Sequence, residues 1–198
     1  MLSKDYQDFI SSCFPKSYGE AHNGLNIHAL FNLKGNELAE AEKIILERIK
    51  DKGGNAIDAA GYLQLQSAKR LLEDEFVKLI QVHDKYSTRI VKVAWALYQI
   101  EKYDKSLDVI IEFLEDIKED NKFPFLGLET FSYLISFGDD PMAISYLEKC
   151  LDVEKYDYYA MCALVSIERG NRLPFFEDNF FLISDLAKKR LAEYKERY

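Results

Sequence analysis

The sequence predicts an all-α fold, a right-handed α-solenoid of about five antiparallel helical hairpins. Three observations support this prediction. The 198 residues include only 4 prolines and 9 glycines, so long helices meet few interruptions. Apolar residues recur at three- and four-residue intervals, as on one face of an α-helix. These apolar segments come in pairs, and the pairs recur roughly every 34 residues, a period typical of helical repeats.

One helical-repeat domain is expected over residues 1–198, with a lead-in helix in residues 1–24 and repeats in 25–198. The expected helices cover 25–33 and 38–49, 56–65 and 68–82, 90–100 and 107–114, 126–137 and 142–151, and 158–167 with a final helix that ends at Tyr198. The last apolar residues of the five first helices are Leu33, Leu65, Ile100, Phe137 and Ile167. Their separations are 32, 35, 37 and 30 residues, so each hairpin is expected to cover the open face of its neighbour.

Polar residues in the breaks are predicted to cap the helices. In the third pair, "VKVAWALYQIEKYDKSLDVIIEFLED", Asp104 is the expected N-cap of the second helix, and Ser87 or Thr88 that of the first. In the fourth pair, Gly138 suits a left-handed C-terminal position, and Asp140 is the expected N-cap before Pro141.

Small residues favour close stacking of neighbouring helices. They occur in the second, third and fifth pairs: Ala59, Ala60, Gly61, Ala94, Ala96, Ala160 and Ala163. A globular helical bundle around one shared core is the alternative to a layered stack.

Three segments resemble the turn and second helix of tetratricopeptide-type units: "KGNELAEAEKIILERI", "EKYDKSLDVIIEFLED" and "GDDPMAISYLEKCLDV". Ser106 and Ala143 stand where such units place a small residue facing the first helix, and Cys150 stands at the second small position. The glycine of the first helix is replaced by Ala94 and Phe131, and no proline closes a unit. HEAT-like pairs therefore fit equally well, and the resemblance implies a helical-repeat protein that binds other proteins.

Composition sets the broad class. The hydrophobic fraction is 48% and the charged fraction 30%, as in ordinary soluble proteins. No apolar run approaches membrane-spanning length, and the first residues lack the basic start and apolar core of a secretion signal, so a cytoplasmic protein is expected. The net charge of −8 disfavours nucleic acid as a partner.

The sequence shows no catalytic or cofactor motif, so neither catalytic residues nor a cofactor are predicted. Cys13, Cys150 and Cys162 are widely spaced, which favours buried reduced thiols. A metal site using Cys13, His22 and His28 is a weaker alternative, because the histidine spacing points to different sides of a helix. The "DKGGNA" glycines indicate a helix stop, since the Lys-Ser/Thr of a phosphate loop is missing.

Acidic residues concentrate in the middle of the chain. Residues 101–157 contain 15 acidic and 6 basic residues, a net charge of −9, whereas the remainder sums to +1. The acidic residues at helical spacing within this region are Glu112, Glu115, Asp116, Glu119 and Asp120, opposite an apolar face. They predict either a solvated outer face or a docking surface for a basic partner.

Aromatic residues late in the chain add candidate contact residues. Tyr156, Tyr158 and Tyr159 flank Asp157, and four phenylalanines follow between 175 and 181. Some are expected to cover the core, and others to line a groove, where tyrosine and phenylalanine commonly anchor interfaces. The candidate partner-binding residues are therefore Glu112, Glu115, Asp116, Glu119, Tyr156, Tyr158 and Tyr159.

The favoured hypothesis is a non-catalytic protein–protein interaction module that binds a protein or an extended peptide, with a basic partner as one hypothesis. A narrower alternative is a bacterial immunity protein that neutralises a cationic toxin. The rival from another class is a HEAT-like glycosylase, which needs a basic DNA-binding groove and a poised carboxylate. A self-assembling structural scaffold is a further alternative.

Overall fold

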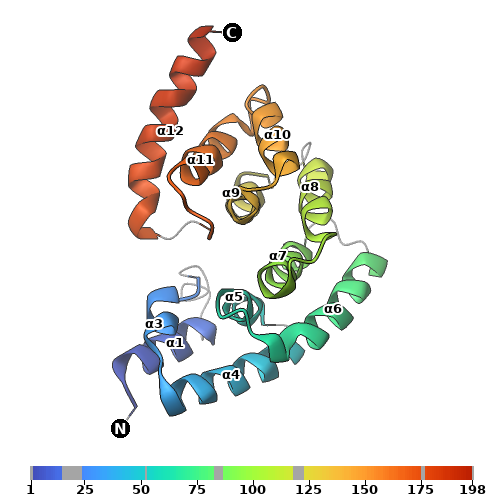
Figure 1. Ribbon diagram of the computed structural model, residues 1–198, viewed down its shortest axis with the longest axis vertical. Coiled ribbons are helices and arrows are strands. Elements are labelled where there is room, and N and C mark those ends of the chain that lie inside the picture. Colours follow the sequence, from blue (N-terminus) through green and yellow to red (C-terminus); the bar gives the residue numbers. More distant parts are fainter. Residues whose placement is uncertain are drawn as a thin grey trace. The chain divides into compact units, whose positions relative to one another are not determined.

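The computed structural model describes residues 2–14, 24–51, 53–82, 87–117, 123–174 and 177–197, and the regular structure in these ranges is entirely helical (Figure 1). The predicted all-α class is confirmed, with no strand among these residues. None of the described helices is both long enough and apolar enough to cross a membrane.

The chain divides into two compact units, unit 1 (Met1–Ser106) and unit 2 (Leu107–Tyr198). The helices of unit 1 are α1 (Lys4–Cys13), α3 (Ile27–Asn32), α4 (Gly35–Lys50), α5 (Gly54–Tyr62), η1 (Gln66–Ala68), α6 (Lys69–Val82) and α7 (Arg89–Glu101). α8 (Ser106–Ile117) starts at the division. The remaining helices of unit 2 are α9 (Phe123–Leu134), η2 (Ile135–Phe137), α10 (Pro141–Cys150), α11 (Asp157–Glu168) and α12 (Glu177–Arg197). The single domain expected over 1–198 stays a prediction.

Helices pack both on their chain neighbours and on the next helix but one. In unit 1, α4 contacts α5 and α6, while α5 contacts α3 and α7. In unit 2, α11 contacts α9, α10 and α12. The expected helices match these elements to within a few residues. The lead-in helix corresponds to α1, whereas residues 15–23 lie outside the described ranges.

Side-chain caps fix several helix starts. The Ser3 hydroxyl accepts from the Tyr6 amide at 3.1 Å, and the Asn26 side chain accepts from the Ala29 amide at 2.9 Å. Asp140 accepts from the Met142 amide at 2.8 Å, which confirms the predicted cap before Pro141.

Two other predicted caps of the third pair are wrong. Thr88 occupies the N-cap position of α7, but its side chain makes no capping hydrogen bond. Asp104 lies in the turn, because α8 begins only at Ser106. The Ser106 hydroxyl instead donates to the Ala94 carbonyl at 2.7 Å and is buried. The sequence pattern located the turn, although it could not fix which polar residue ends it.

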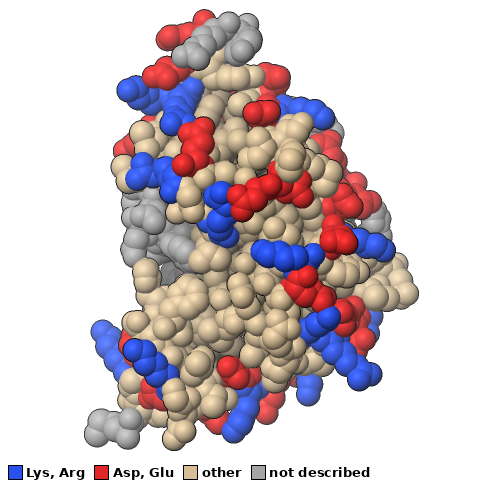
Figure 2. Space-filling view, in the orientation of Figure 1, with Lys and Arg blue, Asp and Glu red and all other residues tan. Residues whose placement is uncertain are grey.

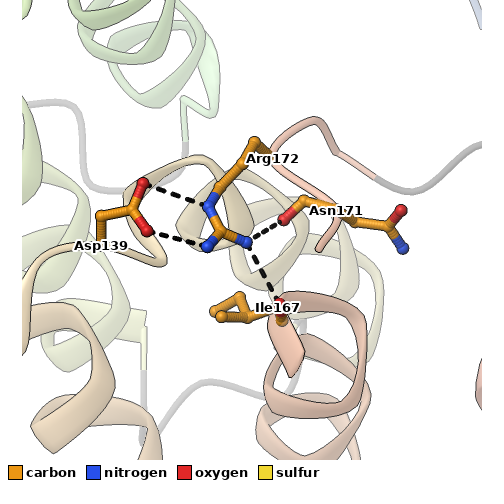
Figure 3. A network of polar contacts seen from close by, with 4 residues as sticks. All are labelled: Asp139, Ile167, Asn171 and Arg172. Atoms are coloured by element: carbon orange, nitrogen blue, oxygen red, sulfur yellow. Dashed lines mark hydrogen bonds and ion pairs between the residues drawn. The ribbon is translucent and has the colours of Figure 1, made fainter. Parts of the chain in front are cut away.

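The prediction that Gly138 is left-handed is also wrong, since its φ is −62°. A Cβ atom at this position would lie 2.7 Å from Cγ2 of Ile167, so glycine is needed here for the close approach of α11. Arg172 reinforces the approach by donating to both carboxylate oxygens of Asp139, at 3.2 and 2.8 Å, and to the Ile167 and Asn171 carbonyls (Figure 3). This network ties the turn before α10 to the end of α11.

An aromatic series runs through the first helices of unit 1. Phe31 on α3 packs edge-on against Tyr62 on α5, with ring centroids 6.2 Å apart, and Tyr62 packs against Trp95 on α7 at 4.8 Å. Trp95 is fully buried over Gly61, where a Cβ atom would come within 2.4 Å of the indole ring. The predicted role of Gly61 in close helix approach is therefore confirmed.

Candidate functional site

The acidity of the protein resides in unit 2. Unit 1 contains 15 acidic and 15 basic residues, whereas unit 2 contains 19 acidic and 11 basic residues, which accounts for the net charge of −8. Figure 2 shows acidic side chains gathered around the position that α8 and α10 occupy in Figure 1. A surface of one sign raises the local concentration of oppositely charged partners.

α8 is amphipathic in the predicted register. Its buried side is formed by Leu107, Ile110, Phe113, Leu114 and Ile117. Glu112, Glu115 and Asp116 are exposed on the same helix. Glu119, the fourth acidic residue predicted for this surface, lies outside the described residues, as does Asp120. Glu112, Glu115 and Asp116 together form the α8 acidic face.

One member of the α8 acidic face is held by a neighbouring helix. The Tyr146 hydroxyl on α10 donates to Glu115 Oε1 at 2.9 Å. Burial raises the pKa of Tyr146 far above its ordinary value, so this hydroxyl stays a proton donor. Glu115 is thus positioned from within the unit, which sequence reasoning missed because Tyr146 lies 31 residues away.

The three candidate tyrosines have different positions. Tyr156 is fully buried, packs edge-on against Phe131 at 5.3 Å, and donates to the Leu114 carbonyl at 2.5 Å. It therefore belongs to the core, and a surface partner could not reach its ring. Tyr158 and Tyr159 are half-buried, and Tyr159 stacks on Phe131 with centroids 6.2 Å apart.

A set of polar contacts that the sequence did not predict joins α12 to α11 and the turn before it. Lys195 Nζ lies 2.5 Å from Asp157 Oδ2, and the Tyr194 hydroxyl donates to Asp152 at 2.9 Å. Arg190 forms an ion pair with Glu168. The Tyr158 hydroxyl shares a hydrogen bond of 2.6 Å with Ser184.

Two of the three cysteines are buried, protonated thiols. Burial raises the pKa of the Cys13 thiol to about 12 and that of Cys162 to about 11, so both thiols stay protonated near neutral pH. In the described part of the chain, no three His, Cys, Asp or Glu side chains lie close enough together to hold a metal ion. His22, part of the weaker metal hypothesis, lies outside these ranges.

A buried carboxylate on α5 forms an ion pair with α7. Asp58 on α5 is 7% exposed and forms an ion pair of 2.7 Å with Lys92 on α7. A buried ion pair between neighbouring helices suits a structural role.

Comparison with protein families, with curated proteins and with solved structures gave no match for this chain.

Proposed function

We propose that this chain is a non-catalytic protein-interaction module, a right-handed α-solenoid that binds a basic protein or peptide through the α8 acidic face. The main support for this proposal is that contacts in unit 1 join residues separated in the sequence by the length of one repeat. Layered hairpins bring equivalent positions of successive repeats together, whereas helices around one shared core need not do so.

Three contacts with a spacing of 34 residues support the layered arrangement. Lys92 pairs with Asp58, and the Gln66 side chain donates to the Ile100 carbonyl at 2.9 Å. In the third contact, the indole ring of Trp95 packs over Gly61. In unit 2, Arg172 and Asp139 are 33 residues apart.

The tetratricopeptide-like resemblance gains support from the small positions. Ser106 and Ala143 are fully buried, and Cys150 is 3% exposed. The hydrogen bond from Ser106 to the Ala94 carbonyl places this small side chain against the preceding helix, as the resemblance implies.

Charge supports a basic partner. Glu112 and Asp116 are exposed carboxylates in a unit with an excess of eight negative charges. Exposed charges at an interface act mainly on association rate and specificity, and salt screens them. Binding of this kind is therefore expected to weaken as ionic strength rises.

The test uses full-length protein as bait in host lysate, identification of captured proteins by mass spectrometry, and affinity measurement with the purified partner. Glu112→Lys/Asp116→Lys is expected to weaken binding about tenfold, from roughly 1 kcal/mol or less per charge plus the new repulsion. Glu47→Lys is the matched control, because Glu47 is exposed on α4 of unit 1, where charges balance. Equal affinity of the double variant and wild type would contradict the proposed surface.

The alternatives require different partners. The immunity-protein hypothesis requires the captured partner to be a cationic toxin whose activity is lost on binding. The glycosylase hypothesis requires binding to duplex DNA, which a fluorescence anisotropy titration measures directly.

A further inference from the structure

We propose that the exposed side of α6 is a self-association surface, through which two copies of the chain form an antiparallel, two-fold symmetric dimer. The exposed residues that form this surface, the α6 face, are Arg70, Asp74, Val77, Lys78 and Ile80. The α6 face belongs to unit 1 and shares no residue with the α8 acidic face, so this inference does not depend on the function proposed above.

The carboxyl-terminal half of α6 is left uncovered by the rest of the chain. α6 contacts α4 and α7 and lies at the edge of unit 1 in Figure 1. Its buried residues are Leu72 and Phe76, and none of residues 77–82 is buried. Val77 is 54% exposed and Ile80 is 46% exposed. Because these two residues are three positions apart, they share one side of the helix, and neighbouring exposed apolar side chains of this kind mark interaction sites.

A row of charged residues runs beside this apolar pair. Arg70, Asp74 and Lys78 recur every four residues, so they follow one side of the helix next to Val77. All three are exposed, and none of them forms an ion pair with another described residue. An acidic residue four positions before a basic one commonly pairs with it within a helix. Here the row instead presents alternating positive, negative and positive charge to a second molecule.

This alternation is complementary to itself in one arrangement. In a two-fold dimer, residue i of one copy meets residue j of the other, and residue j meets residue i. Antiparallel pairing centred midway between positions 74 and 78 places Asp74 opposite Lys78 of the second copy twice, and brings the two Val77 side chains together. Parallel pairing in register would place Asp74 against Asp74 and Lys78 against Lys78. The charges therefore select the antiparallel dimer.

The charge balance also favours a second copy over a strongly basic partner at this position. Unit 1 contains 15 acidic and 15 basic residues, so two copies can approach through it without net repulsion. Unit 2 carries an excess of eight negative charges and would repel its own copy. A partner of one strong sign would meet an opposing charge in the α6 face, because this face contains both signs.

The length of α6 sets the expected strength of the dimer. A helix of 14 residues is about 21 Å long. Pairing over this length places the contact at the low end of protein interfaces, below about 1,200 Å² of buried surface. Contacts of this size are weak and reversible, so a dissociation constant of about 10–100 µM is expected.

The first experiment is sedimentation equilibrium of the full chain from about 5 to about 500 µM, across which wild type is expected to shift from monomer to dimer. Val77→Ser removes an apolar side chain from both halves of the contact and is expected to raise the dissociation constant at least about tenfold. Val82→Ser is the matched control, because Val82 is 72% exposed on the same helix but lies about 140° around it from Val77. Its dissociation constant is expected to stay within about twofold of wild type.

Two results would overturn the proposal. One is a wild-type protein that stays monomeric at the highest concentration. The other is an equal dissociation constant for Val77→Ser and Val82→Ser. Circular dichroism of both variants is expected to match wild type, because both valines are exposed.

The second experiment tests the pairing itself by reversing charges. Asp74→Lys and Lys78→Asp each create two contacts of like charge across the dimer, so each variant is expected to dimerise about tenfold more weakly than wild type. An equimolar mixture of the two variants restores opposite charges at both contacts. The mixture is expected to form a heterodimer about as tight as the wild-type dimer. A mixture that associates no better than either variant by itself would overturn the antiparallel pairing.

Failure of this inference can be distinguished from failure of the proposed function. Val77→Ser is expected to leave the affinity for a basic partner unchanged, because Val77 is not part of the α8 acidic face. A monomeric protein that still captures a basic partner would refute the dimer only. A dimer that captures no basic partner would refute only the function proposed above.

Discussion

Replacing Gly61 with alanine tests the stacking of α5 on α7 and is expected to destabilise unit 1 by about 1–2 kcal/mol. The new Cβ atom would lie 2.4 Å from Cζ3 of Trp95 and 2.9 Å from two further ring atoms. Carbon atoms at optimal separation are about 3.5–4.0 Å apart, so the indole must move by roughly 1 Å. Trp95 is fully buried, so this shift must displace the side chains packed around the ring. Overpacking of this kind costs about 1–3 kcal/mol, and the helix propensity of alanine returns up to about 1 kcal/mol.

The measurement is urea unfolding followed by tryptophan emission. Trp95 is the only tryptophan in the chain, so its emission reports on unit 1 even if unit 2 unfolds separately. Gly54→Ala is the matched control on the same helix, because its Cβ atom would meet nothing closer than Lys92 Cδ at 3.8 Å. The control is expected to stay within about 0.5 kcal/mol of wild type. Equal stability of the Gly61→Ala and Gly54→Ala proteins would refute the close approach of α5 and α7.

Three further predictions follow from single contacts. Lys92→Met leaves the buried Asp58 carboxylate without its ammonium, so a loss of about 3–5 kcal/mol in unfolding free energy is expected, with partial recovery in Asp58→Asn/Lys92→Met. Asp140→Ala removes the cap of α10 and is expected to cost about 1 kcal/mol, measured by thermal unfolding against wild type. The backbone and then the side-chain hydrogen bonds from Ser3 lower the pKa of Glu37 below its ordinary 4.5. Their stabilising effect is therefore present above pH 4.5 and is lost as the pH falls through the lowered value. An acid titration of unfolding should show this loss in wild type but not in Glu37→Gln, and identical profiles would contradict it.

Local patterns predicted the helices well because the signals that define them are local. The break "GDDP" was sufficient to end one helix and to start α10 at Pro141 with Asp140 as its cap. The apolar positions of α8 likewise identified its buried side, since helical periodicity depends only on near neighbours.

Contacts between distant residues could not be predicted in this way. The sequence predicts Gly138 as a left-handed helix end, but its φ is −62°, and glycine is needed because Ile167, far along the chain, leaves no room for a Cβ atom. From the sequence, Tyr156 resembles a surface aromatic beside Asp157. In the structure it is buried, because its ring packs against Phe131 and its hydroxyl donates to the Leu114 carbonyl. The contacts of α12 with Asp152, Asp157 and Glu168 were missed for the same reason.

The dissociation constant of the captured partner, measured against salt concentration, tests the proposed function most directly. Wild type is expected to bind more weakly as salt rises, and Glu112→Lys/Asp116→Lys is expected to show a shallower dependence. A dissociation constant that does not change with salt in either protein would contradict recognition through the α8 acidic face.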